Sequence, residues 1–275
     1  MKGNILPSRA AERPIGVFDS GLGGLTIVHE IRRRLPQESI VYFGDIARLP
    51  YGIKSKEQIL SFSIQNTLFL LKHKIKALVV ACNSSSSAAY PFLKKHFNLP
   101  VVDVIEPAVE AALATTRTRR IGVIATQATV ESGAYEKAIR RRDPRVKVFG
   151  GACPLFVPLV EEGWLDGAIT AKIAQTYLGP LKKNRIDTLI LGCTHYPLLK
   201  SAIQKSVGQG IRLVDSVAPT VRKLASFLNE KQLGYPHSRP GELRIFVSDK
   251  PRNFIGVGER FLDEKLLHVE VVRQK

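Results

Sequence analysis

The sequence predicts an α/β protein built on parallel sheets. Short apolar segments rich in Val and Ile alternate with amphipathic helical segments along the chain. Most of the apolar segments lack the alternating polar residues of a half-exposed strand, which is typical of strands buried on both faces of a parallel sheet. Strand–helix alternation favours right-handed crossover connections. The predicted strands are residues 15–18, 40–43, 77–81, 101–105, 121–125, 146–149, 188–191 and 211–214.

Helical periodicity fills the spaces between these strands, for example over residues 25–35, 55–73 and 167–183. The C-terminal part has a different composition. A helix predicted near residues 218–231 is followed by a loop rich in Gly and Pro at 234–241. Two more strands are predicted at 243–247 and 266–272, with a short helix between them.

The chain also repeats itself weakly. Residues 15–18 (Ile-Gly-Val-Phe) resemble 121–124, and residues 78–82, which end in Cys82, resemble 189–193, which end in Cys193. The two patterns recur in the same order, which indicates two related α/β halves. We expect a flexible tail at 1–12, a first domain formed by 13–105 and 215–275, and a second formed by 106–214.

Composition is that of an ordinary globular protein, with 44% hydrophobic and 24% charged residues in a chain of 275. The chain has no secretory leader pattern and no apolar run of membrane-spanning length, so a cytoplasmic location is expected. The formal net charge of +17 raises the alternative of a nucleic-acid-binding protein. The basic residues are scattered near the ends of predicted helices, which favours a solvated basic surface that would attract an anionic substrate.

Two of the three cysteines lie just past the ends of predicted strands. In parallel α/β sheets, functional side chains gather beyond the carboxyl ends of the strands. If the two halves face each other, the Cys82 and Cys193 thiols lie in one cleft. Cys153 ends no comparable predicted strand and is expected to be a small packed residue.

The residues next to each thiol can assist proton transfer. Asn83 and four serines follow Cys82 at a predicted helix start, where the helix dipole lowers the pKa of a thiol and binds carboxylates. His195 lies two residues after Cys193 and can hold a thiolate or relay its proton. One alternative is a pair of buried structural cysteines. Another is a metal site formed by these two thiols and His195, but a structural zinc site needs four ligands, so we favour catalysis.

Two further strand-end loops carry polar groups. Residues 19–24 (Asp-Ser-Gly-Leu-Gly-Gly) leave backbone N–H groups free for a carboxylate or phosphate, but they lack the full dinucleotide-binding pattern. Residues 44–52 combine Asp, Arg, Pro, Tyr and Gly, and they can line a pocket or form a plain turn.

Taken together, these segments resemble glutamate racemases. The resemblance rests on residues 15–24, 42–45 with 50–52, 81–83 and 191–197, and it continues through 154–161 and 215–216. It implies two flavodoxin-like domains related by pseudo-two-fold symmetry, with the active site in the cleft between them. It implies interconversion of L- and D-glutamate without a cofactor or a metal, supplying D-glutamate for peptidoglycan.

The same resemblance implies roles for individual residues. Cys82 and Cys193 are the two bases, assisted by Asp19, His195 and Glu161. The implied substrate-binding residues are Asp19, Ser20, Pro50, Tyr51, Gly52, Asn83, Ser84, Thr194 and His195. One position departs from the family pattern, which has Thr where this chain has Ser84. Because serine keeps the hydroxyl, we expect binding of the substrate carboxylate to survive, with looser packing.

The resemblance further implies a homodimer and a contact with DNA gyrase as a second activity, without a role for nucleic acid or membrane. Three alternatives stay open at this point. They are a racemase for aspartate or another acidic amino acid, a basic protein that binds nucleic acid, and a metal-site protein.

Overall fold

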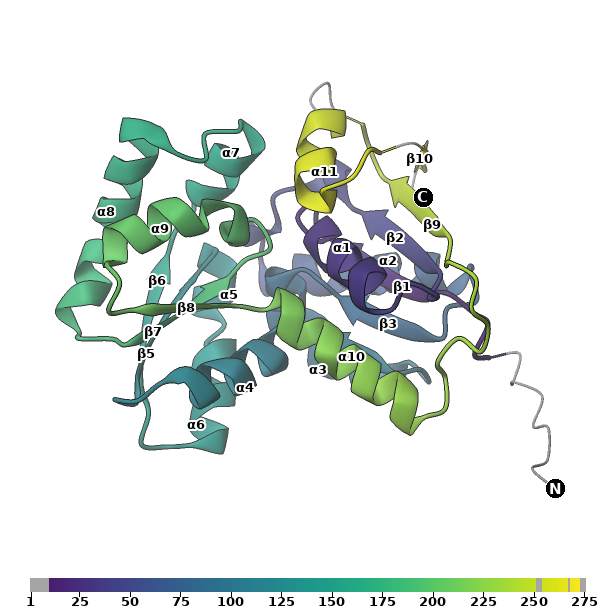
Figure 1. The fold of residues 1–275 in the computed structure, drawn as a ribbon, viewed down its shortest axis with the longest axis horizontal. Coiled ribbons are helices and arrows are strands. Elements are labelled where there is room, and N and C mark those ends of the chain that lie inside the picture. The colour runs from purple at the N-terminus through teal and green to yellow at the C-terminus, as the bar shows by residue number, and fades with distance from the viewer. Residues whose placement is uncertain (1–9, 251–253, 267, 273–275) are drawn as a thin grey trace.

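The computed structural model describes residues 10–250, 254–266 and 268–272, and within these ranges the chain forms two sheets in which every strand pairing is parallel (Figure 1). The first sheet has the order β10-β9-β2-β1-β3-β4, and the second has the order β6-β5-β7-β8. The predicted α/β class is therefore confirmed. The first-sheet strands are β1 (Ile15–Asp19), β2 (Ile40–Gly44), β3 (Ala77–Val80), β4 (Val101–Asp103), β9 (Leu243–Val247) and β10 (Val269–Val271). The second-sheet strands are β5 (Arg120–Ala125), β6 (Lys147–Ala152), β7 (Thr188–Gly192) and β8 (Arg212–Asp215).

The two sheets repeat one strand order. The order β2-β1-β3-β4 in the first sheet matches β6-β5-β7-β8 in the second, with β9 and β10 added at one edge of the first. The sequence segments that resemble each other are β1 with β5 and β3 with β7. The internal repeat seen in the sequence is thus a repeat of topology.

Helices cover both sheets and connect their strands. Helix α10 packs against α1 and α4 where the two sheets adjoin (Figure 1). The helices connected with the first sheet are α1 (Leu25–Arg34), α2 (Lys56–Leu71), α3 (Asn83–His96), α10 (Val217–Glu230) and α11 (Phe254–Leu262). Those near the second are α4 (Ile105–Thr115), α5 (Gln127–Glu131), α6 (Ala134–Arg142), α7 (Phe156–Glu161), α8 (Gly167–Lys183) and α9 (Lys200–Val207). Short 3₁₀ turns are η1 (Ile46–Arg48), η2 (Tyr51–Ile53) and η3 (Tyr196–Leu199).

Some element boundaries differ from the predicted ones for identifiable reasons. The strand predicted at 101–105 ends at Asp103, whose carboxylate accepts hydrogen bonds from the backbone N–H groups of Ile105 and Glu106 and so starts α4. Strand β6 continues to Ala152, because its Gly-Gly-Ala end still pairs with β5. Cys153 therefore directly follows a strand that is longer than predicted, and its side chain is fully buried in the core, as expected of a small packed residue. Of the strand predicted at 266–272, only β10 forms, and residue 267 lies outside the described residues.

The N-terminal tail predicted at residues 1–12 lies mostly outside the described residues. Residues 10–12 form a turn, and the carbonyl of the buried Ala11 accepts a hydrogen bond from Lys76 Nζ at 2.7 Å. Among the described helices, none is both long and apolar enough to cross a membrane.

The largest core cluster is continuous from one sheet domain to the other. It includes Ile15 and Val79 of the first sheet, Leu189 of the second, Phe156 of α7 and Phe261 of α11. Burial of apolar surface contributes about 25 cal/mol per Å². Because side chains of both domains pack in one core, this burial fixes the position of one sheet relative to the other. The carboxyl ends of both sheets therefore have a defined relative position.

Candidate active site

A small pocket lies beyond the carboxyl ends of both sheets. It has a volume of about 20 Å³, which is room for little more than one water molecule. Its lining includes both strand-end thiols, one from each sheet domain. The lining residues are Ser20, Leu49, Pro50, Tyr51, Gly52, Cys82, Asn83, Ser84, Thr126, Val157, Cys193, Thr194 and His195.

The first-sheet side of the pocket places a hydroxyl and a carboxylate near Cys82. The Cys82 Sγ lies 3.6 Å from Ser20 Oγ. Asp19, the last residue of β1, is fully buried, and its Oδ2 accepts a hydrogen bond from Gly21 N at 3.0 Å. Its Oδ1 has no hydrogen-bond partner within the described part of the chain. Asp19 itself lies beneath the pocket lining.

The second-sheet side places an imidazole and a carboxylate near Cys193. His195 Nδ1 lies 3.9 Å from Cys193 Sγ and 3.4 Å from Thr194 Oγ1. On its other side, His195 Nε2 lies 3.2 Å from Glu161 Oε1, at the end of α7. The imidazole thus connects a thiol in the pocket with a carboxylate outside the lining.

The pKa values of titratable groups on the two sides of the pocket are shifted for different reasons. Burial, together with the neighbouring Asp19 carboxylate, raises the pKa of the Cys82 thiol to about 12. Burial also raises the pKa of Asp19 itself, against the opposing charge of His195. For His195, burial lowers the pKa, but hydrogen bonds to Cys193 and Glu161 outweigh it and raise the pKa to about 10.

These values correct one expectation from the sequence. The start of a helix after Cys82 predicted a lowered thiol pKa, and α3 does begin at Asn83. Because Cys82 is 5% exposed and faces a second acid, desolvation and charge repulsion outweigh the helix dipole. Cys82 is therefore held as a neutral thiol.

Hydroxyl groups join the two domains at the pocket wall. Ser84 Oγ lies 3.0 Å from Thr126 Oγ1 and 3.4 Å from Thr129 Oγ1, across the domain boundary. Next to them, Tyr135 OH donates to Asn83 Oδ1 at 2.6 Å. This bond orients the Asn83 amide so that its Nδ2, which has no partner among the described residues, stays available as a donor.

Close backbone approach explains two glycines at the domain boundary. A Cβ on Gly23 would lie 2.3 Å from Thr194 Oγ1 and 2.8 Å from His195 Nδ1. A Cβ on Gly52 would lie 2.7 Å from Thr126 Cβ. Only glycine lets these loops of the first domain touch the second.

The C-terminal helix α11 supports the imidazole from behind. The Phe261 ring packs edge-on against His195 with a centroid distance of 5.0 Å. The adjacent Arg260 Nη1 donates to the Val160 carbonyl at 2.9 Å, one residue before Glu161. A segment far along the chain thus holds both members of the His195–Glu161 pair.

Nearly all residues that the sequence singled out meet at this pocket. Asp19 and Glu161 do not line the pocket themselves but lie directly behind residues that do. Tyr51 lines the pocket, but its hydroxyl points away from the pocket into a polar network. Sequence reasoning missed Leu49, Thr126 and Val157. Thr126 directly follows β5, so the strand-end rule that selected the cysteines could have found it.

A larger hollow of about 500 Å³ lies at the amino ends of strands in the first sheet, lined by residues such as Lys72, His73 and Arg244. Among its lining residues there is no cysteine, so the smaller pocket is the better candidate for chemistry. Within the described residues, no group of three or more His, Cys, Asp or Glu side chains is arranged to hold a metal ion.

The fold and the pocket define a duplicated parallel α/β protein that presents one thiol from each half to a common site. The sequence pattern of the Asp/Glu/Hydantoin racemase family matches residues 25–224. The chain belongs to this family, and it is an isomerase of the racemase type.

Individual relatives cover almost the whole chain. The glutamate racemase of Geobacter metallireducens is 50% identical over 254 residues, which are 92% of this chain and 94% of the relative. That of Neisseria meningitidis serogroup A is 49% identical over 262 residues, covering 95% and 97% of the two chains.

Solved structures agree with this placement. The Francisella tularensis glutamate racemase in complex with D-glutamate has a TM-score of 0.91 at 41% identity, covering 96% of this chain and 99% of that one. The Thermus thermophilus glutamate racemase in complex with β-chloro-D-alanine has a TM-score of 0.86 at 42% identity, covering 96% and 98%. A Pyrococcus horikoshii aspartate racemase homologue shares the fold, at 18% identity, a TM-score of 0.57, and coverage of 79% and 99%.

Proposed function

We propose that this protein interconverts L- and D-glutamate by proton transfer between two thiols and the α-carbon. The observation that carries the proposal is that Cys82 and Cys193, from matched strands of the two halves, line one pocket. Inverting a carbon centre requires a base on one face and an acid on the other. Two thiols at matched positions can supply both.

The unequal surroundings of the thiols decide how the reaction starts. Cys82 is a neutral thiol, because burial and Asp19 disfavour its charged form. On the other side, His195 Nδ1 lies 3.9 Å from Cys193 Sγ, and the pKa of His195 is raised to about 10 by its hydrogen bonds to Cys193 and Glu161. Cys82 is thus suited to act first as the acid, and we assign the part of the base to Cys193, which lies beside the imidazole.

In the reaction the Cys193 thiolate takes the α-proton, and the electron pair of the broken C–H bond stays on the α-carbon and its carboxylate. The Cys82 thiol then gives its proton to the opposite face. The products are the other enantiomer, a Cys193 thiol and a Cys82 thiolate. The reverse direction starts from this second state, and His195 returns the enzyme to the first by proton exchange with solvent.

The proposed reaction uses no cofactor, so fixed hydrogen-bond donors of the protein must stabilise the negative charge that develops on the substrate carboxylate. The unpartnered Asn83 Nδ2, the Ser84 hydroxyl and the Thr194 hydroxyl stand at the pocket and supply them. The unpartnered Oδ1 of the buried Asp19 suits the substrate ammonium group. Ser20 and the backbone of the segment from Pro50 to Gly52 complete the proposed binding set.

Glutamate is favoured over aspartate as the substrate by the relatives. The curated relatives at 42–50% identity are glutamate racemases, whereas the aspartate racemase homologue shares only the fold. The basic surface, with a formal net charge of +17, would attract a dicarboxylate.

The physiological role follows from the same resemblance. We propose that the enzyme acts in the cytoplasm and that the D-glutamate it makes is used there for peptidoglycan synthesis.

We also propose that the protein forms a homodimer, which light scattering can check. A contact with DNA gyrase remains part of the proposal as a second activity. The domain division proposed from the sequence assigns residues 13–105 and 215–275 to the first domain and residues 106–214 to the second. Limited proteolysis near residues 105–106 and 214–215, where the chain passes between the domains, can check it.

The deciding experiment is exchange of the α-proton of L-glutamate in D₂O, followed by proton NMR and circular dichroism, with no cofactor added. Exchange with loss of optical activity is the expected result. If glutamate does not exchange but aspartate does, the substrate assignment is wrong. If neither exchanges, the racemase proposal fails, and DNA binding measured against salt concentration becomes the next test.

A further inference from the structure

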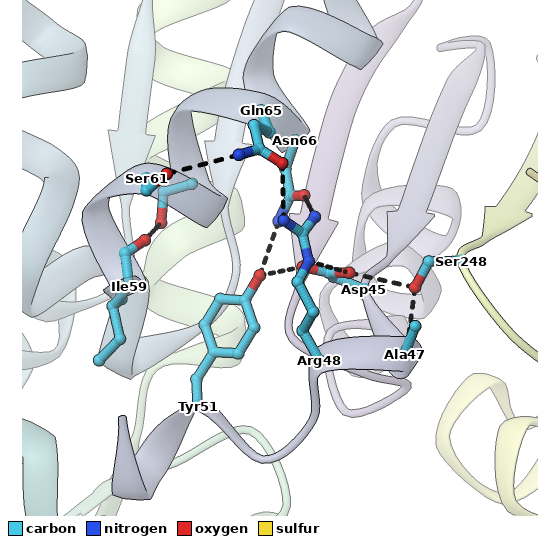
Figure 2. Close-up of polar contacts among 10 residues, drawn as sticks. Asp45, Ala47, Arg48, Tyr51, Ile59, Ser61, Gln65, Asn66 and Ser248 are labelled. Atoms are coloured by element: carbon cyan, nitrogen blue, oxygen red, sulfur yellow. Dashed lines mark hydrogen bonds and ion pairs between the residues drawn. The ribbon is translucent and has the colours of Figure 1, made fainter. Parts of the chain in front are cut away.

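A buried polar network lies behind the pocket segment Leu49–Gly52. Its centre is Asp45, which directly follows β2 and is fully buried. Asp45 Oδ2 lies 2.8 Å from Arg48 Nε and accepts a hydrogen bond from Tyr51 OH, and its Oδ1 accepts one from Ser248 Oγ at 3.1 Å. Figure 2 shows these side chains converging on the Asp45 carboxylate.

The network ties the segment to two other parts of the first domain. On the α2 side, Arg48 Nη1 donates to Gln65 Oε1 at 2.7 Å, and Asn66 Nδ2 donates to Tyr51 OH at 3.1 Å (Figure 2). On the β9 side, Ser248 Oγ accepts from Ala47 N at 2.9 Å. The segment is therefore fixed at the 3₁₀ turn that precedes it, η1, and at the one that it enters, η2.

The same network reaches the reacting groups through the backbone. Asp45 N donates to the carbonyl of Asp19 at 3.0 Å. At the far end of the segment, Gly52 packs against Thr126 of the second domain. The Tyr51 ring is 1% exposed and its hydroxyl is held inside the network, so this side chain anchors the segment and its hydroxyl does not face the pocket.

We propose that Asp45 is a positioning residue, which holds Leu49–Gly52 against the second domain through Arg48, Tyr51 and Ser248 so that the pocket keeps the shape that binds glutamate. This inference rests on the proposed function for its kinetic test. Burying a carboxylate is costly unless its partners satisfy it, and here every partner either belongs to the pocket segment or braces it. Asp45 touches no pocket space itself.

The test compares two carboxylates at opposite ends of strand β2. Asp45→Asn keeps the side-chain shape and removes the charge that holds Arg48. The matched control is Glu38→Gln, since Glu38 is 5% exposed, precedes β2 and pairs with Lys76 at 2.5 Å. Both variants break a buried ion pair, but only the first touches the pocket segment.

For Asp45→Asn we expect KM for glutamate to rise about tenfold, with a smaller change in kcat, because losing hydrogen bonds to a charged group behind the pocket loosens the segment that binds the substrate in the ground state. Amide hydrogen exchange over residues 46–54 should rise in the same variant. Glu38→Gln should lose stability without either effect. A third variant, Tyr51→Phe, should raise KM less than additively with Asp45→Asn, because both act through one contact.

Equal loss of stability in Asp45→Asn and Glu38→Gln, with KM and segment exchange unchanged in both, would overturn the proposal. So would strict additivity of Asp45→Asn and Tyr51→Phe. If the wild-type protein racemises no glutamate, the proposed function fails separately, and the amide-exchange comparison alone then decides whether Asp45 holds the segment.

Discussion

His195 and Glu161 form a hydrogen-bonded pair with 3.2 Å between Nε2 and Oε1, while the other imidazole nitrogen faces the Cys193 sulfur at 3.9 Å. A buried imidazole between two acidic groups keeps its proton. The pair therefore links the charge state of one proposed base to a carboxylate outside the pocket.

This pair predicts a specific pH dependence of stability. The pKa of His195 rises from 6.5 in the unfolded chain to about 10 in the folded protein. The folded protein then binds more protons than the unfolded chain between these values, so its stabilising contribution is complete below pH 6.5 and is lost as pH rises towards 10. Glu161→Gln removes one source of the shift and should move the loss to lower pH. Urea unfolding of both proteins across this range measures it, and superimposable curves would contradict the assignment.

The three cysteines should differ sharply on substitution. Cys82→Ser and Cys193→Ser should each lower racemisation by about a hundredfold or more, because a serine hydroxyl is too weakly acidic to exchange a proton at neutral pH. Cys153→Ser is the matched control, since Cys153 is buried in the core outside the pocket lining. It should lose stability and keep its turnover. Circular dichroism of glutamate solutions gives the rates, and full activity in either pocket variant would exclude the two-thiol mechanism.

Gly23→Ala should impair catalysis through contact across the domain boundary. The added Cβ would lie 2.3 Å from Thr194 Oγ1 and 2.8 Å from His195 Nδ1, so the His195 ring must shift. A displacement of this size near reacting groups costs about a hundredfold in rate. Gly179→Ala in α8, where an added Cβ meets nothing within 4 Å, is the control and should be neutral or stabilising. Equal kinetics of the two variants would show that the boundary yields without affecting the site.

Ser84→Thr should tighten substrate binding modestly. Ser84 is 3% exposed and already hydrogen-bonds Thr126 across the boundary, so threonine keeps that bond and adds one methyl group to the wall. One buried methyl group is worth about 0.8 kcal/mol, or roughly fourfold in KM. Ser87→Thr, in the same helix but outside the pocket lining, should leave KM unchanged. A higher KM for Ser84→Thr would mean that the wall is already fully packed.

Much of this architecture could be predicted because its causes are local. Buried parallel strands need continuous Val and Ile, so both sheets were visible in the sequence, and strand ends located the two thiols. Other features depend on packing between distant segments. Phe261 reaches His195, and Ser248 reaches Asp45, only because β9 and α11 return to the first sheet. The raised pKa of Cys82 has the same origin, since burial is a property of the whole fold.

The repeated strand order has a stereochemical consequence. One half of the chain, with one thiol at the end of its third strand, could remove a proton from a carbon and return it only to the side it came from. Such a unit would catalyse isotope exchange with retention of handedness. The proposed inversion therefore requires both copies in one molecule, and the loss of handedness in the product is a property of the pairing rather than of either half.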